Sequence, residues 1–184
     1  MHLLAVTIVS FASGCTGRSQ DFGIRLEDLE AARTNSGISV SAQQEIVFSA
    51  EARRALQHGV PLRIRIDVAL KGGAGWSGGT DESLVYEIRY LPLSDHYQLS
   101  GPGNESPART YPRLRHVLAA LGRIDLSVPA TQRTEDRLEV RMRSRLDHSG
   151  MPGPMQLPVY LSQQWKHDSG WVAAQVPAQG MVGG

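Results

Sequence analysis

Three segments of the chain alternate apolar and charged residues with a period of two. In residues 62–70 the even positions are apolar, and every odd position except Ala69 is charged. Residues 84–90 and 138–146 repeat the pattern. Successive side chains of a strand point to opposite faces of its sheet, so the pattern predicts strands with one buried and one solvated face. Alternating strands of this kind are typical of antiparallel sheets, whereas the strands of a parallel sheet are uniformly apolar.

Shorter patterns predict further strands. Residues 24–34 and 38–40 flank Asn35-Ser36-Gly37, which is typical of a hairpin turn, and residues 46–48 are predicted as a short strand. We expect the strand at 84–90 to continue past Pro92 into residues 97–100.

Two short helices interrupt the strands. Ser49 can cap a helix over residues 50–58, which Gly59 ends, and Pro112 at a first helical position begins the second. The apolar face of this second helix has helical spacing and consists of Leu114, Val117, Leu118 and Leu121, with Gly122 at its end. Together these signals predict one mainly β (α+β) domain over residues 23–176, an antiparallel β-sandwich or curved sheet with two short helices. Residues 177–184 are predicted to be a disordered tail.

Charge and cysteine content exclude several function classes. The 184 residues carry a formal net charge of +1, so no overall field selects nucleic acid. Cys15 is the single cysteine, which leaves no disulfide within the chain and no thiolate metal site. We expect no cofactor.

Cys15 follows an apolar run of about ten residues and then small residues. A membrane-spanning helix needs roughly 20 residues, whereas this run has the length of a signal-peptide core. The segment resembles a bacterial lipoprotein signal peptide, although no Lys or Arg precedes the run. The resemblance implies a signal over residues 1–15, a polar tether over 16–22, and lipidation of Cys15 at the outer membrane of a Gram-negative bacterium, facing the periplasm. An ordinary cleaved signal and an intracellular apolar N-terminus are the alternatives.

A series of landmarks resembles the proteobacterial domain-of-unknown-function family DUF4390. They are, in chain order, residues 55–62, Trp76, 86–90, 93–97, 111–122, 140–147, 152–154 and 165–171. The resemblance implies an exported or membrane-tethered protein without an assigned activity, whose gene often neighbours a sensor histidine kinase. A glycine-rich tract before Trp76 departs from the charged residues that relatives tend to carry there.

Six arginines occupy the polar positions of the alternating strands: Arg63, Arg65, Arg89, Arg141, Arg143 and Arg145. If the strands are neighbours, these arginines form one positive face, relieved by Asp67, Glu87 and Glu139. Such a face suits an anion-presenting partner such as lipid headgroups or polysaccharide. The alternative is a solvated sheet face held by cross-strand ion pairs.

The three tryptophans are candidates for contact with a partner or ligand. Trp76 lies in the glycine-rich tract 72–79, which lacks the Lys and Ser/Thr that a phosphate-binding loop carries at its helix end, so a hairpin loop exposing the indole is predicted. Trp165 and Trp171 flank residues 166–170, a predicted tight hairpin. Packing in the core or at its rim is the default for these two indoles, and a ligand-stacking platform is the alternative.

Catalytic and metal motifs are weak. The neighbours Asp95-His96, Asp147-His148 and His167-Asp168 lack ligand spacing, and Ser149 lacks a nucleophile-elbow motif. We therefore predict a non-enzymatic, exported binding or accessory protein of the envelope, in contact with a protein partner that the resemblance implies is a membrane sensor kinase. A periplasmic small-ligand or glycan-binding module is the alternative, and a hydrolase the third. A glycan or ligand site would be concave, with Trp or Tyr beside arginines.

Overall fold

The computed structural model describes residues 22–72, 82–102, 107–129, 138–149 and 162–177. Its strands form two antiparallel sheets, here called sheet A and sheet B. Sheet A contains, in spatial order, β1 (Gly23–Thr34), β2 (Gly37–Val47) and β7 (Arg123–Val128). Sheet B contains, in spatial order, β6 (Arg109–Tyr111), β5 (His96–Ser100), β4 (Glu82–Leu91), β3 (Leu62–Gly72), β8 (Leu138–Asp147) and β9 (Val172–Val176).

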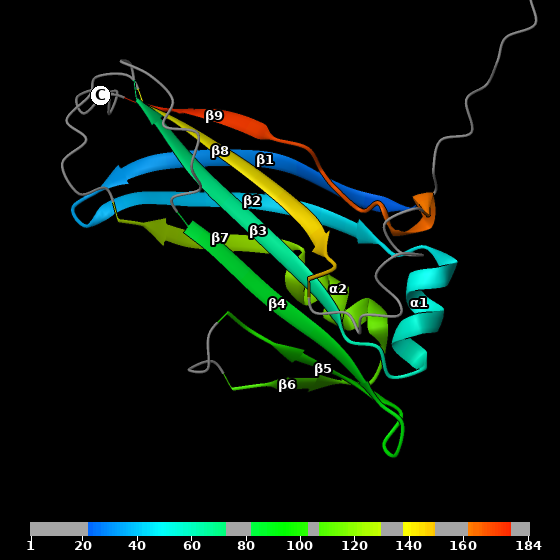
Figure 1. Ribbon diagram of the computed structural model, residues 1–184. Helices are drawn as coiled ribbons and strands as arrows, with labels where there is room; N and C mark the ends of the chain where they lie inside the picture. Colours follow the sequence, from blue (N-terminus) through cyan, green and yellow to red (C-terminus); the bar gives the residue numbers. More distant parts are fainter. Residues whose placement is uncertain (1–21, 73–81, 103–106, 130–137, 150–161, 178–184) are drawn as a thin grey trace, which may run out of the picture.

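The two sheets form two layers with the core between them (Figure 1). The strands of sheet A cross behind the diagonal strands β3, β4 and β8, and β1 contacts β9 where the sheets approach one another. The core combines the inward residues of β2 with those of β3 and β8, among them Val40, Ile64, Val68 and Met142, none of which is more than 1% exposed. The predicted fold class, mainly β with an antiparallel sandwich-like arrangement and two short helices, is confirmed.

The three alternating segments are β3, β4 and β8, and they are neighbours at the centre of sheet B. β3 pairs with β4 on one side and β8 on the other, with Ile66 opposite Leu84 and Ser144. Because directly paired residues share a face, the charged positions of all three strands lie on the outer side of the sheet. The predicted hairpin at residues 35–37 also forms, with Thr34 paired to Gly37.

Both predicted helices form. In α1 (Ala50–Gln57), the Ser49 hydroxyl accepts a hydrogen bond from the Ala52 backbone N–H at 3.1 Å, as an N-cap residue does. The second helix, α2 (Leu114–Leu121), begins two residues later than expected, because Arg113 is extended at the N-cap position. Pro112 therefore precedes the helix instead of opening it.

Three details of the prediction are wrong. Residues 46 and 47 end the long strand β2, and residue 48 follows it, so they form no separate strand. The chain does not run straight on from β4 but reverses at Pro92 and folds back as β5, with Asp95 in a left-handed conformation (φ 52°). Residues 166–170 form no tight hairpin: they connect the short 3-10 helix η1 (Gln163–Trp165) to β9, and Asp168 bridges to Arg145 of β8.

Among the helices in the described part of the chain, none is long and apolar enough to cross a membrane.

Candidate functional site

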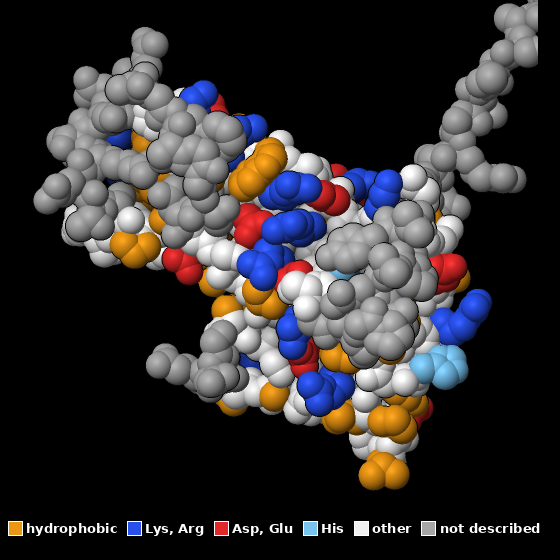
Figure 2. All heavy atoms as spheres, viewed as in Figure 1, with side chains coloured by type: hydrophobic (Ala, Val, Ile, Leu, Met, Phe, Trp, Pro, Cys, Tyr) orange, Lys and Arg blue, Asp and Glu red, His pale blue; other side chains and the backbone are white. Residues whose placement is uncertain are grey.

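The outer face of sheet B carries the six arginines predicted from the sequence. β3 contributes Arg63 and Arg65, β4 contributes Arg89, and β8 contributes the other three. In Figure 2 basic and acidic side chains alternate along this band of the surface. The structure therefore brings together the six arginines as one face, which we call the arginine face.

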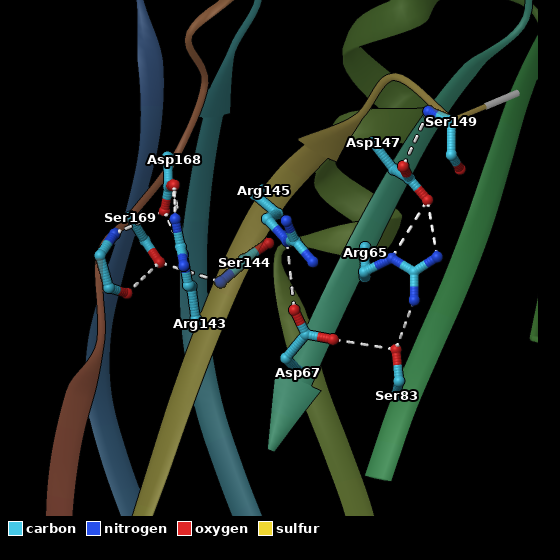
Figure 3. A network of polar contacts seen from close by, with 11 residues as sticks. Arg65, Asp67, Ser83, Arg143, Ser144, Arg145, Asp147, Ser149, Asp168 and Ser169 are labelled. Atoms are coloured by element: carbon cyan, nitrogen blue, oxygen red, sulfur yellow. Dashed lines mark hydrogen bonds and ion pairs between the residues drawn. The ribbon is translucent and has the colours of Figure 1, made fainter. Parts of the chain in front are cut away.

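Asp67 lies at the centre of the arginine face and is buried (6% exposed). Its carboxylate accepts a hydrogen bond from Ser83 Oγ at 2.9 Å and lies 3.2 Å from Arg145 Nε (Figure 3). Ser83 also accepts a hydrogen bond from Arg65 Nη1 at 3.1 Å. The Asp67 carboxylate and the Ser83 hydroxyl of β4 thus link Arg65 of β3 to Arg145 of β8.

Two further carboxylates each organise the arginines beside them. The Asp147 carboxylate accepts a hydrogen bond from Arg65 Nη2 at 2.8 Å and another from the Ser149 backbone N–H at 3.0 Å. Burial alone would raise the pKa of Asp147, but these hydrogen bonds hold it below its ordinary value. Glu87 behaves in the same way, since Arg89 and Arg63 donate to it at 2.7 and 2.9 Å and outweigh the effect of burial on its pKa.

The remaining two arginines contact the segment before β9. Arg143 Nε donates to Asp168 Oδ1 at 2.9 Å, and this pair lowers the pKa of Asp168 against the effect of burial. The Arg141 guanidinium lies 5.7 Å from the centre of the Trp171 ring, a cation–π distance. Residues 168–171 are therefore fastened to β8 by an ion pair and an aromatic contact.

The arginine face is consequently held by ion pairs, and several of these join neighbouring strands, as in the second of the two arrangements that the sequence allowed. Asp67, Glu87 and Glu139 were expected among the arginines, whereas Asp147 and Asp168 were not, and these two receive hydrogen bonds from Arg65 and Arg143. Partly exposed pairs of this kind contribute about 0–1 kcal/mol each to stability.

The predicted binding tryptophans separate. Trp165 is buried (6% exposed) beside α1, while Trp171 remains 36% exposed on the arginine face. The two indoles therefore differ in exposure: Trp165 packs in the core, the default expected from the sequence, and Trp171 is accessible to solvent. Trp76 and the predicted lipidation site Cys15 lie outside the described residues.

Two histidines from the predicted Asp/His pairs have structural contacts. His167 is buried between Phe22 and Phe48, and its Nε2 accepts a hydrogen bond from the Ser49 backbone N–H at 3.0 Å. His148 Nε2 lies 3.2 Å from the carbonyl oxygen of Trp165. Burial lowers the pKa of both imidazoles. Over the part of the chain that the structure describes, no three His, Cys, Asp or Glu side chains gather as a metal site would require.

The buried His167 predicts a pH dependence of stability. Its folded-state pKa lies below the ordinary value of about 6.5, so the unfolded chain takes up the proton first as the pH falls. Stability is therefore fully present above about pH 6.5 and declines below it, by up to about 1.4 kcal/mol per pH unit for this group. We expect His167→Gln, whose amide oxygen can still accept from Ser49, to lose less stability than wild type between pH 7.5 and 5 in urea unfolding. His58→Gln, at an exposed histidine, is the control; equal slopes for all three proteins would contradict the prediction.

A pocket of about 330 Å³ lies on the opposite side of sheet B from the arginine face. It opens between β3–β6 and the α2–β7 segment, and its lining includes Tyr86, Tyr111, Arg109 and Arg123. None of these four residues was predicted to bind a ligand from the sequence, although Tyr86 lies in a predicted strand and Tyr111 in a segment that resembles the family. No local signal identifies them, because the pocket is assembled from residues up to 58 positions apart, from Ile66 to Ile124.

One protein-family model matches the sequence of this chain. The model described as "Domain of unknown function (DUF4390)" matches residues 22–175, most of the chain. The chain belongs to the DUF4390 family. No curated protein and no solved structure matches the chain. The family model covers both sheets of the DUF4390 domain, the arginine face and the pocket.

Proposed function

We propose that this DUF4390 protein is an exported, lipid-anchored binding protein of the cell envelope that contacts a protein partner without catalysing a reaction. The observation that carries the proposal is Trp171, a large aromatic side chain exposed on the arginine face and seated against Arg141. Tryptophan and arginine are enriched among the residues that dominate protein–protein affinity. The family resemblance implies a membrane sensor kinase as the class of partner.

The surroundings of Trp171 support this role. Arg143 and Asp168 are paired beside it, so binding would not have to order these two side chains. The arginine face mixes both charges, which favours a polar partner surface with complementary charges over a uniformly anionic one. Export and attachment through Cys15 would place this face in the periplasm.

Site-specific crosslinking in cells tests the proposal. Ala173 is exposed on the same face, directly opposite Arg141, and is a suitable position for a photo-crosslinking amino acid. We expect a discrete adduct whose yield falls at least about fivefold with Trp171→Ala, the loss that about 1 kcal/mol at a binding hot spot produces. Leu93→Ala is the matched control, because Leu93 is also a large exposed apolar residue but lies in the β4–β5 turn.

The outcomes separate the parts of the proposal. An adduct that Trp171→Ala and Leu93→Ala reduce equally would contradict a role for Trp171. The intact mass of the same membrane-purified protein, compared with Cys15→Ala, tests the anchor: an acyl-sized increment that the variant lacks supports it, and an unmodified full-length mass refutes it.

A second candidate function is the small-ligand or glycan-binding module. The pocket behind sheet B favours it, because the pocket is concave and places two tyrosines beside two arginines. These arginines, Arg109 and Arg123, are not members of the arginine face. A hydrolase is the third candidate; the hydrogen bonds described above for the His148 and His167 rings are with the Trp165 carbonyl and the Ser49 backbone N–H.

A further inference from the structure

The pocket behind sheet B has an apolar floor that reaches the core. Ile66, Leu99, Leu121 and Ile124 line it, and each of these side chains is at least nine-tenths buried. They come from β3, β5, α2 and β7, so the floor lies where sheet B, helix α2 and sheet A meet (Figure 1). An apolar group placed there would be shielded from water on several sides, which favours its binding.

Polar groups without protein partners surround this floor. Within the described residues, the Arg109 guanidinium and the hydroxyls of Tyr86 and Tyr111 form no hydrogen bond or ion pair. Burial raises the pKa of Tyr86, which keeps its hydroxyl protonated as a donor. These groups contrast with the arginine face, where the arginines are held by carboxylates or by an indole.

The charge of the pocket is positive. Arg109 and Arg123 are its charged residues among those described, and Arg123 donates to Asp125 at 2.9 Å, outside the pocket lining. Arg109 is therefore the cation left to meet a ligand. A guanidinium and phenol hydroxyls together suit a carboxylate, which accepts several hydrogen bonds at once.

We propose that this pocket binds a small amphipathic monoanion, with the apolar body on the Ile66–Leu99–Ile124 floor and a carboxylate-like head at Arg109. The volume of about 330 Å³ corresponds to roughly ten groups the size of a water molecule, at about 30 Å³ each. A carboxylate with an eight-carbon chain has about this size. The inference makes the second candidate function specific and is independent of the partner proposed for Trp171.

Titration of the full chain with sodium octanoate, followed by backbone amide NMR shifts, tests the inference. We expect saturable binding with the largest shifts in β6 and at the C-terminal end of α2. Butanoate should bind at least about tenfold more weakly, because it lacks four methylene groups that the floor would cover. 1-Octanol should also bind about tenfold more weakly, because it lacks the charge that Arg109 would meet.

Matched variants assign the site. Arg109→Gln should weaken octanoate binding about tenfold, whereas Arg115→Gln, at an exposed arginine of α2 outside the pocket, should leave it unchanged. Ala120→Phe should abolish binding, because Ala120 lines the pocket and is exposed, so that the larger ring occupies the space without entering the core. Thermal unfolding reports whether each variant folds. If the Ala120→Phe protein does not fold, the comparison of Arg109→Gln with Arg115→Gln assigns the site by itself.

Three results would overturn the inference: no saturable binding of octanoate, equal binding of octanol, or equal affinity of the Arg109→Gln and Arg115→Gln proteins. None of these affects the crosslink expected at Ala173, so failure of the ligand site is distinguishable from failure of the partner proposal.

Discussion

Replacement of Trp165 by alanine lowers the free energy of unfolding by about 3–5 kcal/mol, the range for removing a buried aromatic side chain. Trp165 is 6% exposed, belongs to the core cluster and ends the 3-10 helix η1 that packs against α1. Its ring meets His148 edge-on at 6.2 Å between centroids. A cavity at this position removes the contacts of η1 with α1 as well as the apolar area of the indole.

Urea and thermal unfolding measure the effect. For a domain of this length the expected loss corresponds to a fall of roughly 10 °C in Tm. Trp171→Ala is the matched control, since it removes the same side chain from an exposed site and should cost under about 1 kcal/mol. Equal losses for the two variants would show that Trp165 is not a core residue.

Asp67→Ala is expected to destabilise the protein by about 2–3 kcal/mol. The buried carboxylate accepts hydrogen bonds from the Ser83 hydroxyl and from Arg145 Nε. Its removal leaves both donors without this acceptor. It also removes the negative charge between the arginines of β3 and β8, where Arg65 is paired directly with Arg145. Like charges directly opposite one another destabilise a sheet.

The control for Asp67 is Asp125→Ala. Asp125 also pairs with an arginine, at 2.9 Å, but its side chain is 60% exposed, so its removal should cost under about 1 kcal/mol. A double-mutant cycle with Arg145→Ala isolates the coupling: the loss for Asp67→Ala should shrink when Arg145 is already absent. Equal destabilisation by the two single aspartate variants, or a cycle without coupling, would contradict the importance of burial at Asp67.

Much of the fold could be predicted because its signals are local. The period-two pattern of residues 62–70, 84–90 and 138–146 defines β3, β4 and β8 without reference to other strands. The Ser49 cap and Gly59 likewise bound α1. The position of six arginines on one solvated face follows from the same pattern once these strands are neighbours.

Other elements could not be predicted, because their signals depend on distant segments. The short strands β6, β7 and β9 have weak patterns of their own and are defined by pairing with β5, β2 and β8. Pro92 followed by apolar and polar residues did not reveal the reversal into β5, which depends on the left-handed conformation of Asp95. Trp165 and Trp171 are chemically identical, and only packing against α1 or Arg141 distinguishes them.

The sequence by itself determined which residues face water on each strand, since the alternation of side chains is a property of the strand alone. The tertiary structure decided which charges meet: Asp168 reaches Arg143 from 25 positions away because residues 166–170 lie along β8. It also decided that β3–β6, α2 and β7 together form a pocket with an apolar floor beside Arg109. Such contacts depend on strand order and chain closure, which no local pattern specifies.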